Sequence, residues 1–174
     1  MRLYKVILVL LWAVFFHAGF SSAQIQDVEL NECHDETLGI TLLCNPEWPF
    51  LSEENVIMLI LNDSPLVTAT IAVSDSPVLS LKQLTNDVIQ ELGGYKDGFQ
   101  TQMVQFGGQE AIQVAGVHKT YENVGLVDYY VIHDVNLYSI LFSVEPKDNW
   151  WDYEELLFKI RDSIQWDGNE ETQK

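Results

Sequence analysis

The glycine pair Gly107-Gly108 is the feature that most restricts how this chain can fold. Strand-like segments rich in β-branched and apolar residues lie on both sides of it, over residues 99–106 and 109–121. Glycine adopts the positive φ angles of a two-residue hairpin turn, so the two segments are predicted to pair as an antiparallel hairpin. Two further segments follow at short intervals and extend the hairpin into a meander. They span residues 126–133 and 137–144.

The rest of the chain is predicted to add three strands and two helices. The strands precede the first helix and span residues 38–43, 56–61 and 66–73. The first helix begins after Ser80 as N-cap and ends at Gly93-Gly94, and the second covers residues 151–164. Each helix has an apolar stripe with a spacing of three and four residues. The stripes are Leu81, Leu84, Val88 and Leu92, then Tyr153, Leu157, Ile160 and Ile164.

These elements predict an α+β fold in the order three strands, helix, four strands, helix. Because short hairpins dominate, the sheet of about seven strands should be mainly antiparallel, with both helices packed against it. Symmetrical pairing about a turn at residues 122–125 would place Lys119 opposite Asp128 as a favourable cross-strand ion pair.

Residues 1–23 have the composition of a secretory signal peptide. Arg2 and Lys5 precede a continuous apolar run, and small residues stand immediately before Gln24. The run is shorter than the roughly 18 apolar residues that a membrane-spanning helix needs. We therefore expect cleavage before Gln24 and a mature protein that is periplasmic or secreted, with no remaining membrane span.

The mature chain has the length of one domain and contains no linker or internal repeat. Residues 24–37 form an acidic N-terminal segment in this interpretation. The α+β domain covers residues 38–166, and residues 167–174 form a frayed tail.

The chain is strongly acidic, with 26 Asp and Glu residues, nine Lys and Arg residues and a formal charge of −17. Signal cleavage removes Arg2 and Lys5 but no acidic residue, which leaves seven basic residues and a charge of about −19. Nucleic acids and anionic membrane surfaces bind proteins through Lys and Arg, so both are excluded as partners. The acidity favours a protein partner that is itself basic.

Cys33 and Cys44 are the two cysteines of the chain. In an exported protein they predict one structural disulfide, which would contribute about 2–3 kcal/mol to stability. The adjacent residues His34, Asp35 and Glu36 offer one nitrogen and two carboxylates, and a distant residue such as His118 would complete a zinc-like set. Adjacent ligands bind weakly and a structural zinc site needs four well-placed ones, so we expect neither a metal nor another cofactor.

The three histidines of the mature chain are not accompanied by a catalytic motif. They are His34, His118 and His133, and no nucleophile elbow, zinc-protease motif, EF-hand, phosphate loop or dinucleotide fingerprint occurs. We therefore expect the protein not to be an enzyme. The alternative, a carboxylate- or metal-dependent hydrolase, requires at least two of the histidines to converge with acids at one site.

The order of elements and the residues at their joints resemble the PsbP-like family, which includes the PsbP subunit of photosystem II and bacterial DcrB-type proteins. The resemblance covers residues 38–166. It rests on the opening Asn45-Pro46-Glu47-Trp48, the helix after the third strand, the glycine turn Gly107-Gly108-Gln109-Glu110-Ala111, and an aromatic strand before the closing Ser163-Ile164-Gln165-Trp166. It implies a binding or assembly module, a fold shared with a Ran-binding nuclear import factor, and no catalytic residues.

The sequence therefore predicts an exported, non-catalytic module that engages another protein. Trp150 and Trp151 are adjacent at a helix start and cannot both face the core. Together with Phe50 they are the candidate partner-binding residues, because aromatic side chains are enriched at interaction hot spots. A carrier of a small ligand or metal remains an alternative, and it would require an enclosed cavity between sheet and helices, near Leu84 and Leu157.

Overall fold

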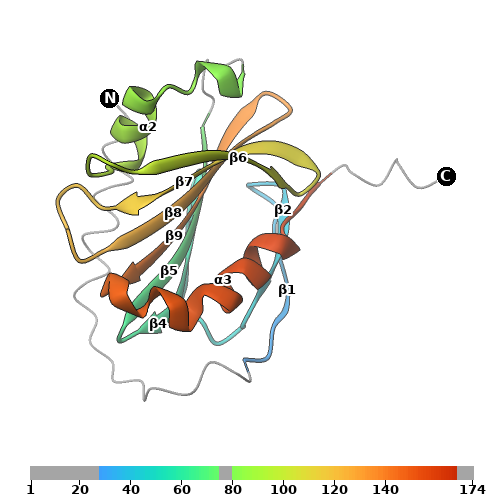
Figure 1. The fold of residues 1–174 in the computed structure, drawn as a ribbon. Helices are drawn as coiled ribbons and strands as arrows, with labels where there is room; N and C mark the ends of the chain where they lie inside the picture. The colour runs from blue at the N-terminus through green and yellow to red at the C-terminus, as the bar shows by residue number, and fades with distance from the viewer. Residues whose placement is uncertain (1–27, 75–79, 168–174) are drawn as a thin grey trace.

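A computed structural model describes residues 28–74 and 80–167 of the protein. Within them the chain forms a seven-stranded sheet, a three-stranded sheet and two α-helices (Figure 1). The large sheet has the order β3-β4-β5-β9-β8-β7-β6 and the small one β1-β2-β10, and all neighbouring strands are antiparallel. The strands are β1 (Asn31–Asp35), β2 (Ile40–Cys44), β3 (Phe50–Glu53), β4 (Val56–Asp63), β5 (Leu66–Ser74), β6 (Gln100–Phe106), β7 (Gln109–Val117), β8 (Gly125–His133), β9 (Asn136–Glu145) and β10 (Gln165–Trp166). The helices are η3 (Leu81–Gln83), α2 (Asn86–Gly93), η4 (Lys147–Asn149) and α3 (Trp150–Ser163), of which η3 and η4 are single 3-10 turns.

This architecture confirms the predicted α+β class and the mainly antiparallel sheet. The predicted order of elements is wrong in one respect, because five strands rather than three precede α2. The additional strands are β1 and β3, and a further short strand, β10, follows α3. The predicted signal peptide, residues 1–23, and the end of the predicted tail, residues 168–174, lie outside the described residues.

The meander β6-β7-β8-β9 forms as predicted. Gly107 and Gly108 connect β6 to β7 with φ angles of 55° and 79°, the left-handed conformation that glycine adopts without strain. The expected pairing of Lys119 with Asp128 is wrong, because β7 ends at Val117 and pairs there with Gly125. Asp128 lies opposite Val114, and its side chain is buried.

The first predicted helix is divided into two parts. Residues 81–83 form the 3-10 turn η3, and Leu84 has an extended backbone that ends it. The N-cap of α2 is therefore Thr85 and not Ser80, and the Thr85 hydroxyl accepts a hydrogen bond from the Val88 amide at 3.4 Å. Gly94 ends α2 in the left-handed conformation, as expected.

The large sheet separates two hydrophobic cores. Because side chains alternate along a strand, Tyr129 of β8 packs with α3 on one face, whereas its neighbour Tyr130 packs with α2 on the other. The predicted stripe of α3 is buried throughout its length. Leu84 and Leu157, the two positions that the carrier alternative singles out, are both buried, Leu84 in the core beneath α2 and Leu157 in the core beneath α3.

Candidate functional site

The start of α3 separates the two adjacent tryptophans. Trp150 packs against the core beside the backbone of Gly125, and its indole nitrogen donates a hydrogen bond to Glu154 at 3.4 Å. The side chain of Trp151 points away from the core and is 76% exposed. Because Trp150 anchors the helix end, the exposed indole of Trp151 is held on a fixed backbone.

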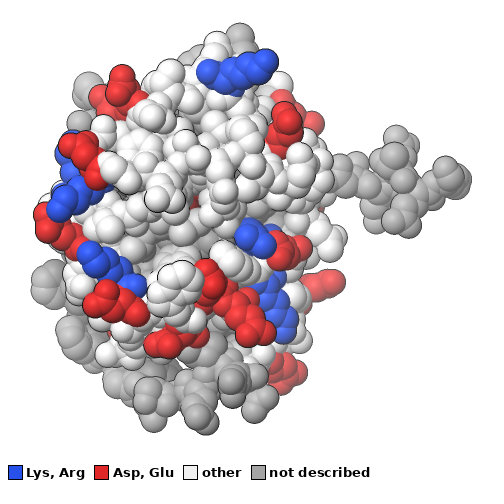
Figure 2. Space-filling model, in the orientation of Figure 1, with Lys and Arg blue, Asp and Glu red and all other residues white. Residues whose placement is uncertain are grey.

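Acidic residues lie close to Trp151 in the sequence, in η4 and in the first turns of α3. Asp148, Asp152 and Glu155 are all exposed. Basic residues follow further along the helix, at Lys159 and Arg161. Figure 2 shows acidic (red) and basic (blue) side chains together over this part of the surface. A tryptophan with charged neighbours has the composition of an interaction hot spot, in which an apolar anchor is ringed by polar groups.

Phe50 lies at the start of the edge strand β3 and is 46% exposed. It pairs with Leu59, whose side chain belongs to the core beneath α3, so Phe50 faces the same side of the sheet as that helix. The next residue, Leu51, is 44% exposed and pairs with Met58 on the opposite face. The predicted partner-binding residues thus share one side of the sheet, and Leu51 is a natural control on the other.

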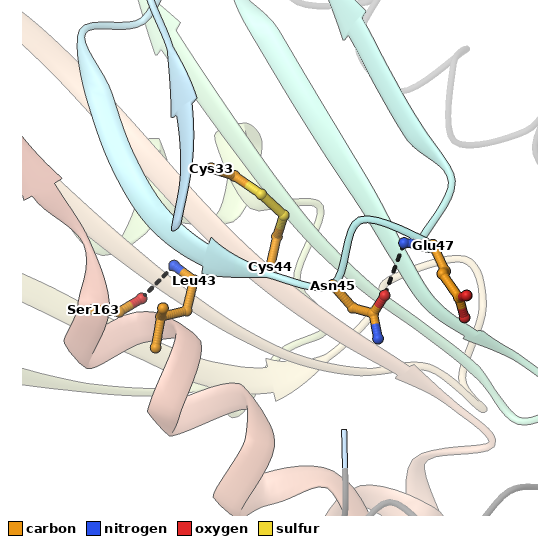
Figure 3. The surroundings of a disulfide bond; sticks show 6 residues. All are labelled: Cys33, Leu43, Cys44, Asn45, Glu47 and Ser163. Carbon is orange, nitrogen blue, oxygen red and sulfur yellow. Dashed lines mark hydrogen bonds between the residues drawn. A yellow bond between two sulfur atoms is a disulfide. The ribbon is translucent and has the colours of Figure 1, made fainter. Parts of the chain in front are cut away.

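The predicted disulfide between Cys33 and Cys44 is confirmed, and it connects β1 to β2 with Cα atoms 5.9 Å apart (Figure 3). Beside it, the Leu43 amide donates a hydrogen bond to the Ser163 hydroxyl at 2.8 Å, which ties β2 to the end of α3. After β2, the Asn45 side chain accepts a hydrogen bond from the Glu47 amide at 2.7 Å and turns the chain. The disulfide and the hydrogen bond from Leu43 to Ser163 therefore hold β1, β2 and the end of α3 together at this corner.

The candidate metal ligands beside the disulfide have structural partners. His34 lies 3.1 Å from the Thr41 hydroxyl and 3.8 Å from the Asp167 carboxylate. Asp35 accepts a hydrogen bond from the Leu38 amide at 2.8 Å and so stabilises the turn that leads into β2. Among residues 28–74 and 80–167, no three His, Cys, Asp or Glu side chains are placed to hold a metal ion.

The other two histidines lie in separate surroundings. His118 accepts hydrogen bonds at Nδ1 from two backbone amides of the following turn, at 3.0 and 3.1 Å, and burial lowers its pKa. His133 stacks on Trp166 with ring centroids 5.0 Å apart and lies 3.7 Å from the Asp134 carboxylate. His118 therefore stabilises a turn, and His133 packs against Trp166 of β10.

A buried polar cluster, which the sequence analysis missed, lies on the face of the sheet that carries α2. Its centre is Asp128, which is 2% exposed, and whose carboxylate is bonded to the Ser139 hydroxyl. Burial raises the pKa of Asp128 to about 6. The hydroxyl groups of Tyr95 and Tyr130 are buried nearby and interact with this carboxylate, and burial raises the pKa of both tyrosines.

Tyr95 reaches this cluster because two glycines leave room for its ring. A Cβ atom on Gly93 would lie 2.1 Å from the Tyr95 ring, and one on Gly116 would lie 3.1 Å from it. The pair of glycines therefore fixes the tyrosine between α2 and β7. A sequence signal existed in Gly93-Gly94-Tyr95, but glycines near a helix end are first interpreted as a helix stop.

A scan against protein-family models found no match, and a search of curated proteins found none. Solved structures match over most of the chain. The cyanobacterial PsbP protein (CyanoP) of Synechocystis superposes with a TM-score of 0.59 at 14% identity, covering 84% of this chain and 98% of that chain. The Ran-binding protein Mog1p of Saccharomyces cerevisiae superposes with a TM-score of 0.53 at 10% identity, covering 80% of this chain and 96% of that chain.

The fold is that of PsbP and Mog1. LpqN of Mycobacterium tuberculosis, described as involved in cell envelope biogenesis, also shares it, with a TM-score of 0.51 at 14% identity over 79% of this chain and 90% of that one. The predicted resemblance to the PsbP-like family is thereby confirmed at the level of the fold.

Two of the residue patterns behind that resemblance meet in the PsbP-like fold. A Cβ atom on Gly107, in the hairpin turn, would lie 2.8 Å from the indole nitrogen of Trp166, in the closing segment. The glycine turn and the terminal tryptophan are therefore packing partners. In the described part of the chain, no helix is long and apolar enough to cross a membrane.

Proposed function

We propose that the protein is an exported, non-catalytic binding module that engages another protein through the surface at the start of α3. The observation that carries the proposal is the exposed indole of Trp151, held on a helix end that Trp150 anchors in the core. A large aromatic side chain exposed on a rigid element loses little conformational entropy on binding, which suits an interaction anchor.

The partner is basic in this proposal. Three exposed acidic residues, Asp148, Asp152 and Glu155, lie within four positions of the anchor in the sequence, and the chain as a whole carries a formal charge of −17. Complementary charge accelerates association and excludes acidic competitors. Mog1p, which shares the fold, is described as a Ran-binding protein, and this supports a binding role for the fold without identifying a partner here.

Export is the second part of the proposal. It is supported by the predicted signal peptide, residues 1–23, and by the Cys33–Cys44 disulfide, because disulfides persist in oxidising compartments. Expression in a bacterial host followed by N-terminal sequencing of the periplasmic fraction tests it. We expect the chain to start at Gln24, and an uncleaved chain in the cytoplasm contradicts export.

Affinity capture from periplasm or culture fluid, followed by mass spectrometry, tests the binding role. We expect one specific protein to be enriched by the native chain, and to be lost with Trp151→Ala and reduced with Phe50→Ala. Leu51→Ala is the matched control, since Leu51 adjoins Phe50, has nearly the same exposure and lies on the opposite face. Binding that survives Trp151→Ala, or that falls equally with Leu51→Ala, contradicts the proposed surface.

A further inference from the structure

The large sheet ends in an edge strand, β6, that lacks the usual protection against pairing with another strand. β6 spans Gln100–Phe106, with the sequence QTQMVQF, and within residues 28–74 and 80–167 it pairs with β7 alone. It contains no charged residue and no proline, and its register with β7 runs from end to end without a bulge. Natural edge strands commonly carry charges, prolines or bulges that prevent intermolecular pairing.

The opposite edge of the same sheet shows the contrast. β3 has four residues against seven in β6, and it ends at Glu53, which is followed by a second glutamate. On the face drawn in Figure 2 the surface over β6 is largely uncharged, although the chain as a whole is strongly acidic. Most of β6 is exposed, including Met103 at its centre, which is 59% exposed.

From these observations we propose that β6 is a dimerisation edge, which pairs antiparallel with β6 of a second copy about a two-fold axis at Met103. This symmetry places each Met103 beside its equivalent, and Thr101 opposite Gln105 of the second copy. The two seven-stranded sheets then form one continuous sheet. An isologous contact of this kind is closed, so it yields dimers and not filaments.

Charge favours a second copy as the occupant. Two chains that each carry a charge of −17 repel one another wherever acidic surfaces meet, but β6 places uncharged residues against uncharged residues over its full length. The proposed register also pairs polar side chains across the new contact. The Gln102 side chain is already used within the chain, where it donates a hydrogen bond to Gln113 of β7 at 3.0 Å, and Gln105 lies opposite Thr101 of the second copy, where amide and hydroxyl can hydrogen-bond.

Sedimentation equilibrium of the purified protein over a wide concentration range measures the dimer directly. We expect reversible dimerisation that tightens as salt is raised, because salt screens the repulsion between two acidic copies. Met103→Lys should weaken the dimer at least tenfold, since it places two positive charges opposite one another at the axis. Met103→Leu is the matched control and should leave the dimer intact.

Cysteine cross-linking tests the register independently of the lysine variant. Opposing residues in an antiparallel pair have Cα atoms about 4.5–5.5 Å apart, within the range of a disulfide, so Met103→Cys should form a covalent dimer on oxidation. Gln102→Cys is the control, because its equivalent in the second copy would be about 8 Å away and outside disulfide range. A chain that remains monomeric at every concentration overturns the proposal and leaves the edge to a strand of a different protein. A dimer that persists in Met103→Lys, or cross-linking that is equal in the two cysteine variants, overturns it as well.

Discussion

The Ser139 hydroxyl lies 3.0 and 3.2 Å from the two carboxylate oxygens of Asp128, and it is the polar side chain bonded to that buried acid across the β8-β9 pair. Interactions with Ser139, Tyr130 and the Tyr129 backbone favour the ionised carboxylate, but they do not replace the water that it loses on burial. The ionised form of Asp128 is therefore unfavourable in the folded protein, and its pKa is raised from 3.8 to about 6.

This shift gives Asp128→Asn a pH-dependent effect on stability. Below about pH 3 the acid is largely protonated in both folded and unfolded chains, so it contributes little difference in stability between them. Between 3.8 and about 6 the unfolded chain ionises first, so the native protein loses stability as the pH rises. At pH 7.5 we expect the asparagine variant to be more stable by about 2–3 kcal/mol, and at about pH 3 the contribution of ionisation to this difference should be close to zero.

Denaturant unfolding of both proteins across this pH range measures the difference. Asparagine has the shape of aspartate and accepts the same hydrogen bond from Ser139, so packing is preserved. A stability difference that is independent of pH would contradict the assignment of the effect to ionisation of Asp128.

Gly93→Ala should destabilise the protein by at least about 2 kcal/mol, because the new methyl group would overlap the Tyr95 ring, which is completely buried. Thermal and denaturant unfolding measure the loss. The double variant Gly93→Ala/Tyr95→Ala is the informative control, since removal of the ring also removes the overlap. If the two substitutions prove additive, the clash is not the cause.

Ser163→Ala should cost about 1–2 kcal/mol, because it leaves the Leu43 amide of β2 without its hydrogen-bond acceptor. Ser163→Thr keeps the hydroxyl and should recover most of the loss. Hydrogen exchange at the Leu43 amide gives a local readout, and we expect it to accelerate in the alanine variant alone. Unchanged exchange would show that this bond does not hold β2 to α3.

Reduction of Cys33–Cys44 should lower the stability by about 2–3 kcal/mol, which corresponds to a fall in melting temperature of about 5–10 °C. The double variant Cys33→Ser/Cys44→Ser should reproduce that fall, and should be insensitive to reductant. A reduced protein that melts at the same temperature would indicate that the hydrogen bonds of β1 with β2 suffice to hold this corner.

The elements that could be predicted from the sequence are those with a strong local pattern. The apolar stripe of α3 and the glycine turn at Gly107-Gly108 each determine a local conformation, and both are found in the structure. β1 and β3 were missed because their residues are mostly exposed and lack an apolar alternation. β10 has two residues, and it exists as a strand only through its pairing with β2.

The Asp128 cluster could not be predicted because it depends on long-range pairing. The register of β7 with β8 follows from where β7 ends, and the residue after Val117, His118, pairs instead with Tyr95. A turn centred on residues 122–125 gives a different register and places Asp128 on the surface opposite a lysine. The exposure of Trp151 was easier to anticipate, since adjacent helical residues cannot both face one core.

The small sheet holds the first and last described strands on the two sides of β2. Ile40 pairs with Asp35 of β1 and with Trp166 of β10, so β1 and β10 run parallel, two strand spacings apart. The end of β10 is then about 17 Å from the start of β1, a distance that a linker of six or seven residues can span. The protein should therefore tolerate circular permutation, with those two strands joined and new ends opened at Val135, the 83% exposed tip of the β8-β9 hairpin. The packing of this fold depends on which strands are neighbours in the sheets, and more than one order of these strands along the chain is compatible with that packing.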